Sequence, residues 1–170
     1  MLVVIHRSQL DNHEKRMSTF YKLWNNHPTG EFPCSTEGKK NFDNQCAIRM
    51  GECFEKAGVS TKSWPVRRCW QHKGAGSHIL AAEELANALT RIVVPGMKKV
   101  EKYSGKDGFE KLKNRTGIIF FKDFYGPGMQ GDHIDLWNGW RLSSLASVIS
   151  VYTPWGSRYD KGAIWFWEMA

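Results

Sequence analysis

The sequence predicts an α+β fold in which N-terminal helices pack on an antiparallel sheet. Apolar residues recur at helical spacing in three segments of the first hundred residues. Beyond Lys113 they instead form short runs or alternate with polar residues, as in strands. Helices followed by strands favour an antiparallel sheet. The chain has 170 residues, 41% of them hydrophobic, which is enough for one core, so we expect a single domain over residues 1–170.

The predicted helices are bounded by residues that start and stop helices. Asp43 and Asn44 are good N-caps for the second helix, and Gly58 ends it. The third helix follows Ser77 and ends before Pro95. A loop rich in Pro and Gly separates the first two helices. The predicted segments are residues 8–26, residues 45–57 and the stretch from Ser77 to Pro95.

Short apolar runs in the second half of the chain predict the strands. They are rich in Ile, Val, Phe and Trp, which favour pleated, half-buried surfaces. A Gly-Pro-Gly loop at residues 126–128 separates the first two, and together the runs predict a sheet of four or five strands. The predicted strands are residues 116–121, 133–138, 147–152 and 163–167.

The formal net charge of +7 favours anionic partners but does not choose among them. A basic nucleic-acid-binding module, or another binding domain without catalysis, is therefore the alternative function. The basic residues are dispersed and form no aromatic-basic motif, so we do not expect nucleic acid as the partner. No apolar run reaches the roughly 20 residues of a membrane span. The N-terminus does not read as a signal peptide, so we expect a soluble cytoplasmic chain that is exported by another machine.

Cys46 is the candidate nucleophile because it lies in the first turn of a predicted helix. The unpaired N–H groups and the dipole of a helix start stabilise a thiolate. The same N–H groups can hold the oxyanion that forms when the thiolate attacks a carbonyl. The structural alternative, left open by position alone, is a small buried side chain.

His133 is the candidate base, and the strand that carries it places Asp135 and Trp137 on the same face. An imidazole on a rigid strand can reach a helix start packed across it, take the thiol proton and return it to a leaving amine. A histidine of purely structural role in the sheet is the alternative. Trp137, Tyr125 and Phe124 either line a cleft or belong to the core.

No metal or cofactor is expected. The cysteines form no C-x-x-C pair, and zinc ribbons and fingers need close pairs to converge on one ion. A disulfide among Cys34, Cys53 and Cys69 in an oxidising compartment is left open. The other histidines lie in predicted helices, loops or the terminal segment without an evident partner: His6, His13, His27, His72 and His78.

Two motifs, residues 44–50 (Asn-Gln-Cys-Ala-Ile-Arg-Met) and residues 131–139 (Gly-Asp-His-Ile-Asp-Leu-Trp-Asn-Gly), together resemble the type VI secretion amidase effectors of family four. The order of a cysteine at a helix start and then a histidine on a strand is also that of this family. The resemblance extends from the first helix to the C-terminal strand. It implies a papain-like cysteine peptidase core, related to the cell-wall amidases of the NlpC type.

The resemblance further implies an antibacterial toxin delivered into the periplasm of a rival bacterium. Such enzymes hydrolyse the γ-D-glutamyl-meso-diaminopimelate bond of peptidoglycan stem peptides, and a cognate immunity protein protects the producer. Family members usually carry an aspartate about ten residues past the histidine, which orients the imidazole. Here residues 140–144 contain no carboxylate. Asp135 is the best substitute, and Ser144 or a backbone carbonyl stays open as the third member.

Overall fold

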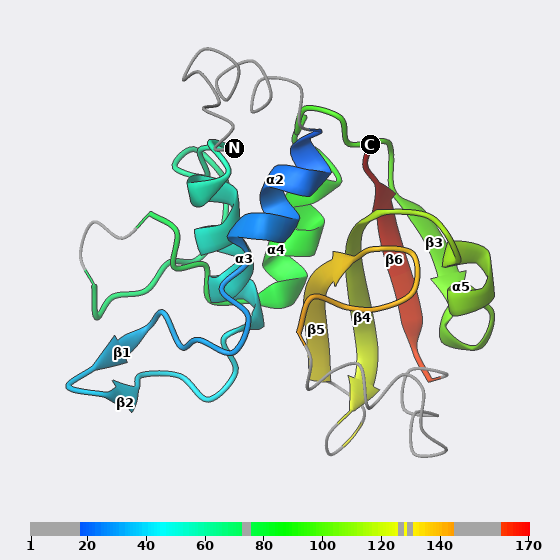
Figure 1. Cartoon of the computed structure of the whole chain (residues 1–170). Helices are drawn as coiled ribbons and strands as arrows, with labels where there is room; N and C mark the ends of the chain where they lie inside the picture. Colours follow the sequence, from blue (N-terminus) through cyan, green and yellow to red (C-terminus); the bar gives the residue numbers. More distant parts are fainter. Residues whose placement is uncertain (1–17, 73–75, 126–127, 129–130, 145–160) are drawn as a thin grey trace, which may run out of the picture.

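The computed structural model describes residues 18–72, 76–125, 128, 131–144 and 161–170. Its described part is an α+β fold, with helices α2, α3 and α4 beside a four-stranded antiparallel sheet (Figure 1). The predicted fold class is confirmed. The beginning of the first predicted helix, before residue 18, and the predicted strand 147–152 lie outside the described residues. Within them, no helix is long and apolar enough to span a membrane.

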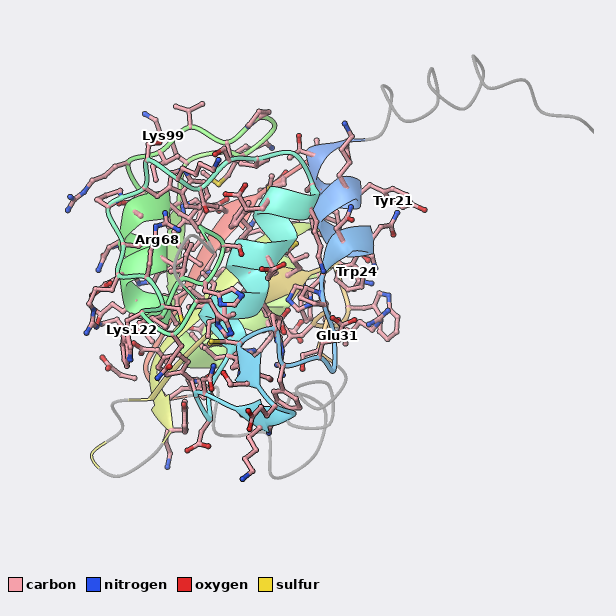
Figure 2. The ribbon with its side chains drawn as sticks, turned by 90° about the vertical axis from the view of Figure 1, so that its left-hand side faces the viewer. Tyr21, Trp24, Glu31, Arg68, Lys99 and Lys122 are labelled. Carbon is pink, nitrogen blue, oxygen red and sulfur yellow. The ribbon has the colours of Figure 1, made fainter. Side chains whose placement is uncertain are left out.

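Helix α2 (Thr19–Asn26) begins after Ser18, whose hydroxyl accepts the Tyr21 N–H at 3.3 Å. This cap satisfies one of the donors that every helix start leaves unpaired. Phe20 and Leu23 are buried against the rest of the fold, whereas Tyr21 is 51% exposed and points away from the body of the molecule (Figure 2). The apolar face predicted to hold Phe20, Tyr21, Leu23 and Trp24 is therefore confirmed for Phe20 and Leu23 and is wrong for Tyr21.

Helix α3 (Cys46–Lys56) starts one residue later than predicted. The N-cap is Gln45 rather than Asp43 or Asn44, although the Asn44 side chain, one residue earlier, accepts the Cys46 N–H at 3.1 Å. Gly58, with a φ of +83°, follows the helix and ends it in a conformation that favours glycine. Gly51 lies inside α3, where a Cβ would overlap the carbonyl of Ser77. The helix is thus packed directly against the backbone of the loop that follows it.

Helix α4 (Ala82–Leu89) is shorter than the predicted third helix. Ile79 forms an antiparallel bridge with Arg68, and the Leu80 N–H donates to the Arg67 carbonyl at 3.1 Å. These two apolar residues fit a helical pattern, but their backbone is extended and pairs with the preceding loop. The predicted start at Ser77 and the predicted end near Pro95 are both wrong.

The sheet has the strand order β3-β6-β4-β5, and all three pairings are antiparallel. Strand β3 and helix α5, which follows it, were not predicted. Neither was a small separate hairpin ahead of α3. The bounds are β1 (Ser35–Thr36), β2 (Lys39–Lys40), β3 (Glu101–Ser104), α5 (Gly105–Leu112), β4 (Gly117–Tyr125), β5 (Gly131–Trp137) and β6 (Ala163–Glu168).

The side chains of edge strand β5 alternate between two apolar clusters. Ile134 and Leu136 belong to the larger cluster, which contains the buried faces of α2, α3 and α4. Trp137 belongs to the second cluster, together with Phe121 of the neighbouring strand. The predicted two-residue alternation of this strand is confirmed. Helix α3 contacts β5 directly, and this contact brings the start of the helix to the strand that carries His133.

Candidate active site

Cys46 is held at the start of α3 by a link to the sheet. Its N–H donates to the Asn44 Oδ1, and the Asn44 Nδ2 donates to the Tyr125 hydroxyl of β4 at 3.1 Å. The helix dipole and the first-turn N–H groups make this end of α3 electropositive. Cys46 is 5% exposed, so access to its sulfur is narrow.

His133 lies between the Cys46 thiol and the Asp135 carboxylate. Its Nε2 is 3.3 Å from the Asp135 Oδ2, and the Cys46 side chain is near enough to the ring to interact with it and raise its pKa. Because Nε2 faces the carboxylate, Nδ1 is the nitrogen available to the thiol. The ring stacks on Phe121 with 6.2 Å between centroids, and 16% of the side chain is exposed. Packing and hydrogen bonding thus fix the orientation of the imidazole.

The electrostatics favour a protonated imidazole. Burial opposes the charge on His133, but the hydrogen bond to Asp135 and the interactions with Cys46 outweigh it and raise the pKa of His133 to about 10. Burial likewise opposes the charge on Asp135, but the hydrogen bond and the charge of His133 hold the pKa of this carboxyl below its ordinary value. At neutral pH the two groups form an imidazolium–carboxylate pair.

Asp135 is 1% exposed and has several further hydrogen-bond donors. The Ser143 hydroxyl donates to its Oδ1, the Ser144 N–H donates to its Oδ2 at 3.3 Å, and its own neighbour Leu136 donates its N–H at 2.7 Å. Ser143 stands ten positions past His133, where the resemblance leads one to expect an aspartate. The carboxylate beside His133 is that of Asp135, on the same strand, and both serines donate hydrogen bonds to it.

His27 is a member of the site that the sequence analysis missed. Its Nε2 is 3.7 Å from the Asp135 Oδ1, and its side chain is 3% exposed. Its Nδ1 is 3.0 Å from the Thr29 hydroxyl, which donates to the Ser143 carbonyl at 3.1 Å. Burial lowers the pKa of His27 in spite of Asp135, so this ring is neutral at pH 7. Nothing in the local sequence identifies it, because the contact depends on the path of a loop.

The aromatic residues near the site divide between core and surface. Trp137 is 2% exposed and its indole N–H donates to the Leu112 carbonyl at 2.8 Å, so it is a core residue. Phe124 is also buried, whereas Tyr125 is 36% exposed beside Asn44. The core interpretation therefore holds for Trp137 and Phe124.

The remaining cysteines are free thiols. The Cys53 thiol donates to the Leu23 carbonyl at 3.0 Å, inside the main core. Cys34 and Cys69 lie together in a small third cluster, with their sulfurs 3.3 Å apart. The sequence left open a disulfide among Cys34, Cys53 and Cys69; in the structure all three are free, and Cys34 and Cys69 are the two that lie together.

An α+β fold that brings a thiol at a helix start to a histidine on the sheet defines the class of papain-like cysteine peptidases. The family model of the type VI secretion system (T6SS) amidase effector protein 4, Tae4, matches residues 42–167. The chain belongs to this family, and the prediction that it is an amidase is confirmed. Effectors of this family are delivered to target bacteria.

Solved structures of the same family are similar in fold. The Tae4 of Enterobacter cloacae, in its effector–immunity complex with Tai4, is 18% identical, with a TM-score of 0.62 over 91% of this chain and 99% of that one. The Tae4 of Salmonella typhimurium, from the Tae4/Tai4 effector–immunity system, is 19% identical, with a TM-score of 0.55 over 76% of this chain and 75% of that one. No curated protein sequence matches the chain.

Proposed function

We propose that this amidase, acting as a single domain, hydrolyses the γ-D-glutamyl-meso-diaminopimelate bond of peptidoglycan stem peptides. Cys46 is the nucleophile, His133 is first base and then acid, and Asp135 orients the imidazole and stabilises its charge. The observation that carries this proposal is the His133 ring, which is hydrogen-bonded to a buried carboxylate and also interacts with the Cys46 side chain.

The reaction follows from these positions. The reaction starts with the thiol proton of Cys46 on His133, in keeping with the protonated imidazole, and the thiolate attacks the γ-carbonyl carbon of the D-glutamyl residue. The first-turn N–H groups of α3 stabilise the oxyanion. His133 then gives its proton to the departing amine of diaminopimelate, which leaves a thioester on Cys46. A water molecule, deprotonated by His133, hydrolyses the thioester, releases the γ-carboxylate of the D-glutamyl residue and restores the thiol.

Asp135 supports both proton transfers. It accepts from Nε2 and so keeps Nδ1 directed at the thiol, in the way that the third member of a triad fixes the tautomer of its histidine. Its burial among Ser143, Ser144 and His27 keeps its position fixed during the reaction. The donors from the two serines also keep the carboxylate ionised, because they favour its charged form.

The substrate and partners follow from charge and family. A net charge of +7 favours a polymer that carries carboxylates, as peptidoglycan stem peptides do. We propose that the enzyme acts in the periplasm of the target cell and that a cognate immunity protein blocks its cleft. The relatives crystallised with Tai4 immunity proteins support this partner. We expect no salt-dependent affinity for DNA or RNA, which a basic nucleic-acid-binding domain would show.

The test is digestion of purified sacculi that contain diaminopimelate, with the fragments read by mass spectrometry. The wild-type chain should release a free amine on diaminopimelate, and Cys46→Ala should release none. Cys53→Ala is the matched control, because Cys53 is also a buried cysteine of α3 but lies against Leu23 rather than His133. A product cut elsewhere in the stem would contradict the proposed bond, and an active Cys46→Ala would contradict the proposed nucleophile.

A further inference from the structure

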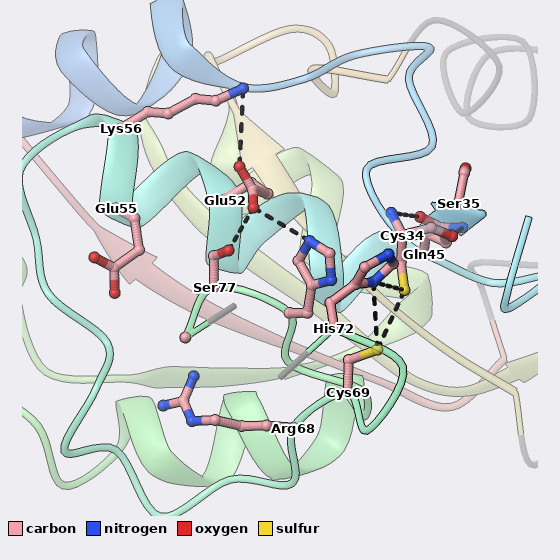
Figure 3. A network of polar contacts seen from close by, with 12 residues as sticks. Cys34, Ser35, Gln45, Glu52, Glu55, Lys56, Arg68, Cys69, His72 and Ser77 are labelled. Atoms are coloured by element: carbon pink, nitrogen blue, oxygen red, sulfur yellow. Dashed lines mark hydrogen bonds and ion pairs between the residues drawn. The ribbon is translucent and has the colours of Figure 1, made fainter. Parts of the chain in front are cut away.

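Four potential metal ligands converge away from Cys46 and His133. Cys34 precedes the β1–β2 hairpin, and Cys69, His72 and His78 belong to the long loop between α3 and α4. One ligand atom from each of these residues lies within 4.8 Å of all the others. Figure 3 shows Cys34, Cys69 and His72 directed at one another. The His72 and His78 rings also meet edge to face, with 5.1 Å between centroids.

The distances suit one tetrahedral ion. The Cys34 and Cys69 sulfurs are 3.3 Å apart, and the His72 Nδ1 is 3.4 Å from the first and 3.8 Å from the second. Around a tetrahedral zinc, with its characteristic bond lengths, two sulfurs lie about 3.8 Å apart, and a sulfur and a nitrogen about 3.5 Å apart. A small outward movement of one thiol therefore gives these three ligands tetrahedral spacing, and the His78 ligand atom lies within 4.8 Å of all three.

His78 supplies the independent observation. It is 6% exposed, and its Nδ1 is one of the buried polar side-chain atoms that have no hydrogen-bond partner in the described part of the chain. A buried nitrogen without a partner is costly. Its other nitrogen, Nε2, is 3.3 Å from the Glu52 carboxylate, which also accepts from the Ser77 hydroxyl. A histidine that binds a metal through one nitrogen and a carboxylate through the other has this arrangement.

We propose that Cys34, Cys69, His72 and His78 bind one zinc ion, and that Glu52 orients His78 toward it. Two thiolates and two imidazoles are a ligand set that zinc prefers, and four protein ligands make the site structural, with no open position for catalysis. A disulfide between Cys34 and Cys69 is the competing arrangement. It would leave the His78 Nδ1 without a partner, whereas the ion satisfies all four groups.

The ion would cross-link two segments that few buried apolar contacts stabilise: the one before the β1–β2 hairpin and the loop between α3 and α4. The cluster around Cys34 and Cys69 has one further buried apolar member, Ile48, so apolar burial contributes little stability there. The Gln45 side chain accepts the Cys34 N–H and donates to the Cys34 carbonyl, both at 2.9 Å. Gln45 directly precedes Cys46. Zinc at Cys34 therefore stabilises the segment that leads into the helix start.

The first test is the metal content of the full chain, purified under reducing conditions from zinc-supplemented cells. The wild type and Cys46→Ala should both carry stoichiometric zinc, whereas Cys34→Ser and His78→Gln should lose it. Glu52→Gln keeps all four ligands, and its zinc affinity should fall about 10- to 100-fold. Because Cys46→Ala lacks the proposed nucleophile but keeps the zinc ligands, metal content is tested separately from the amidase mechanism. Wild-type protein without zinc, or Cys34→Ser with full zinc, would refute the proposal.

Cobalt(II) substitution gives a second readout, and the spectrum of the wild type alone already tests the ligand set without any variant. The wild type should show the intense visible bands of a tetrahedral ion and a thiolate-to-cobalt charge-transfer band. Cys69→Ser should weaken the charge-transfer band, and Cys53→Ser should leave it unchanged. A spectrum of an octahedral ion with oxygen ligands would overturn the assignment. So would a Cys34–Cys69 disulfide found by peptide mapping of chain kept under reducing conditions.

Discussion

Asp135→Asn isolates the contribution of the carboxylate to the proposed mechanism, because it removes the charge and keeps the shape. The rise in the pKa of His133 from 6.5 to about 10 corresponds to about 5 kcal/mol in favour of the imidazolium, shared between Asp135 and Cys46. Loss of roughly half of this slows the reaction about 100-fold. If the His133 ring also takes the wrong tautomer, the rate falls by about 10⁴-fold, as it does in triads whose aspartate is replaced by asparagine. We therefore expect kcat/KM to fall between about 10²- and 10⁴-fold.

The dependence of the activity on pH should change in a defined direction in Asp135→Asn. Activity requires a proton on His133 for the leaving amine, so it is lost as pH rises through the pKa of this group. In the wild type this alkaline limb should lie near pH 10, and in Asp135→Asn it should move toward neutrality. The assay is release of the diaminopimelate amine from a soluble stem peptide between pH 5 and pH 11, a range chosen to bracket both limbs of the profile.

Asp132→Asn is the matched control, since Asp132 is on the same strand but accepts the Asp123 N–H at 2.9 Å. It should change neither the rate nor the alkaline limb. Ser143→Ala keeps the Asp135 carboxylate but removes one donor to it, and it should shift the limb in the same direction by less. If Asp135→Asn folds and matches the Asp132→Asn profile, Asp135 has no role in the proton transfers. An unshifted limb in Ser143→Ala would contradict the proposed support of the carboxylate.

Three further predictions follow from the packing and the charges. Iodoacetamide should label Cys46 before Cys53, because burial and the nearby Asp135 raise the pKa of the Cys53 thiol far above its ordinary value; peptide mapping that found Cys53 labelled first would contradict this. The folded-state pKa of His133 is raised, so its stabilising contribution is full below about pH 6.5 and is lost as pH rises to about 10. The urea midpoint should fall across this window, and less so in His133→Gln. Gly51→Ala should lower the free energy of unfolding by about 1–3 kcal/mol, because the added Cβ overlaps the Ser77 carbonyl; an unchanged urea midpoint would show that the loop moves away freely.

The proposed dyad could be predicted because each member has a local signal. Cys46 follows a capping residue at the start of an apolar-periodic segment, and His133 alternates with Ile134 on a strand that has one face toward the helices. Helix caps and strand alternation depend on neighbours in sequence. The contact between the two elements was inferred from the order of the motifs and the family resemblance, since no local pattern encodes it.

The segments that were misjudged depend on distant pairing. Ile79 and Leu80 have helical spacing relative to Leu85, but the extended backbone around Arg68 offers them hydrogen bonds that a helix would not need. Strand β3 is a polar, four-residue segment whose partner, β6, begins 59 positions after its last residue. Short edge strands of this kind have weak intrinsic preference, because packing against the partner determines their stability.

The cluster of Cys34, Cys69, His72 and His78 could not be predicted either, because it also depends on contacts between segments that are distant in sequence. We looked in the sequence for two cysteines in one turn, whereas here the close pair is Cys69 and His72, and Cys34 lies in a separate loop. Only the fold brings the two loops together.

The start of α3 is fixed from two sides, and this links the proposed zinc site to the proposed dyad. Asn44 ties the helix start to Tyr125 of the sheet, and the adjacent Gln45 ties it to the backbone of Cys34. A thiolate nucleophile must stay within hydrogen-bonding distance of its base while a bulky polymer binds, and a displacement of about 1 Å can cost about 100-fold in rate. Gln45 is 2% exposed, and its side chain is hydrogen-bonded to both the N–H and the carbonyl of Cys34. A displacement of Cys34 therefore displaces Gln45 and, with it, the adjacent Cys46. An ion that immobilises Cys34 would therefore act on catalysis through position alone, without touching the substrate.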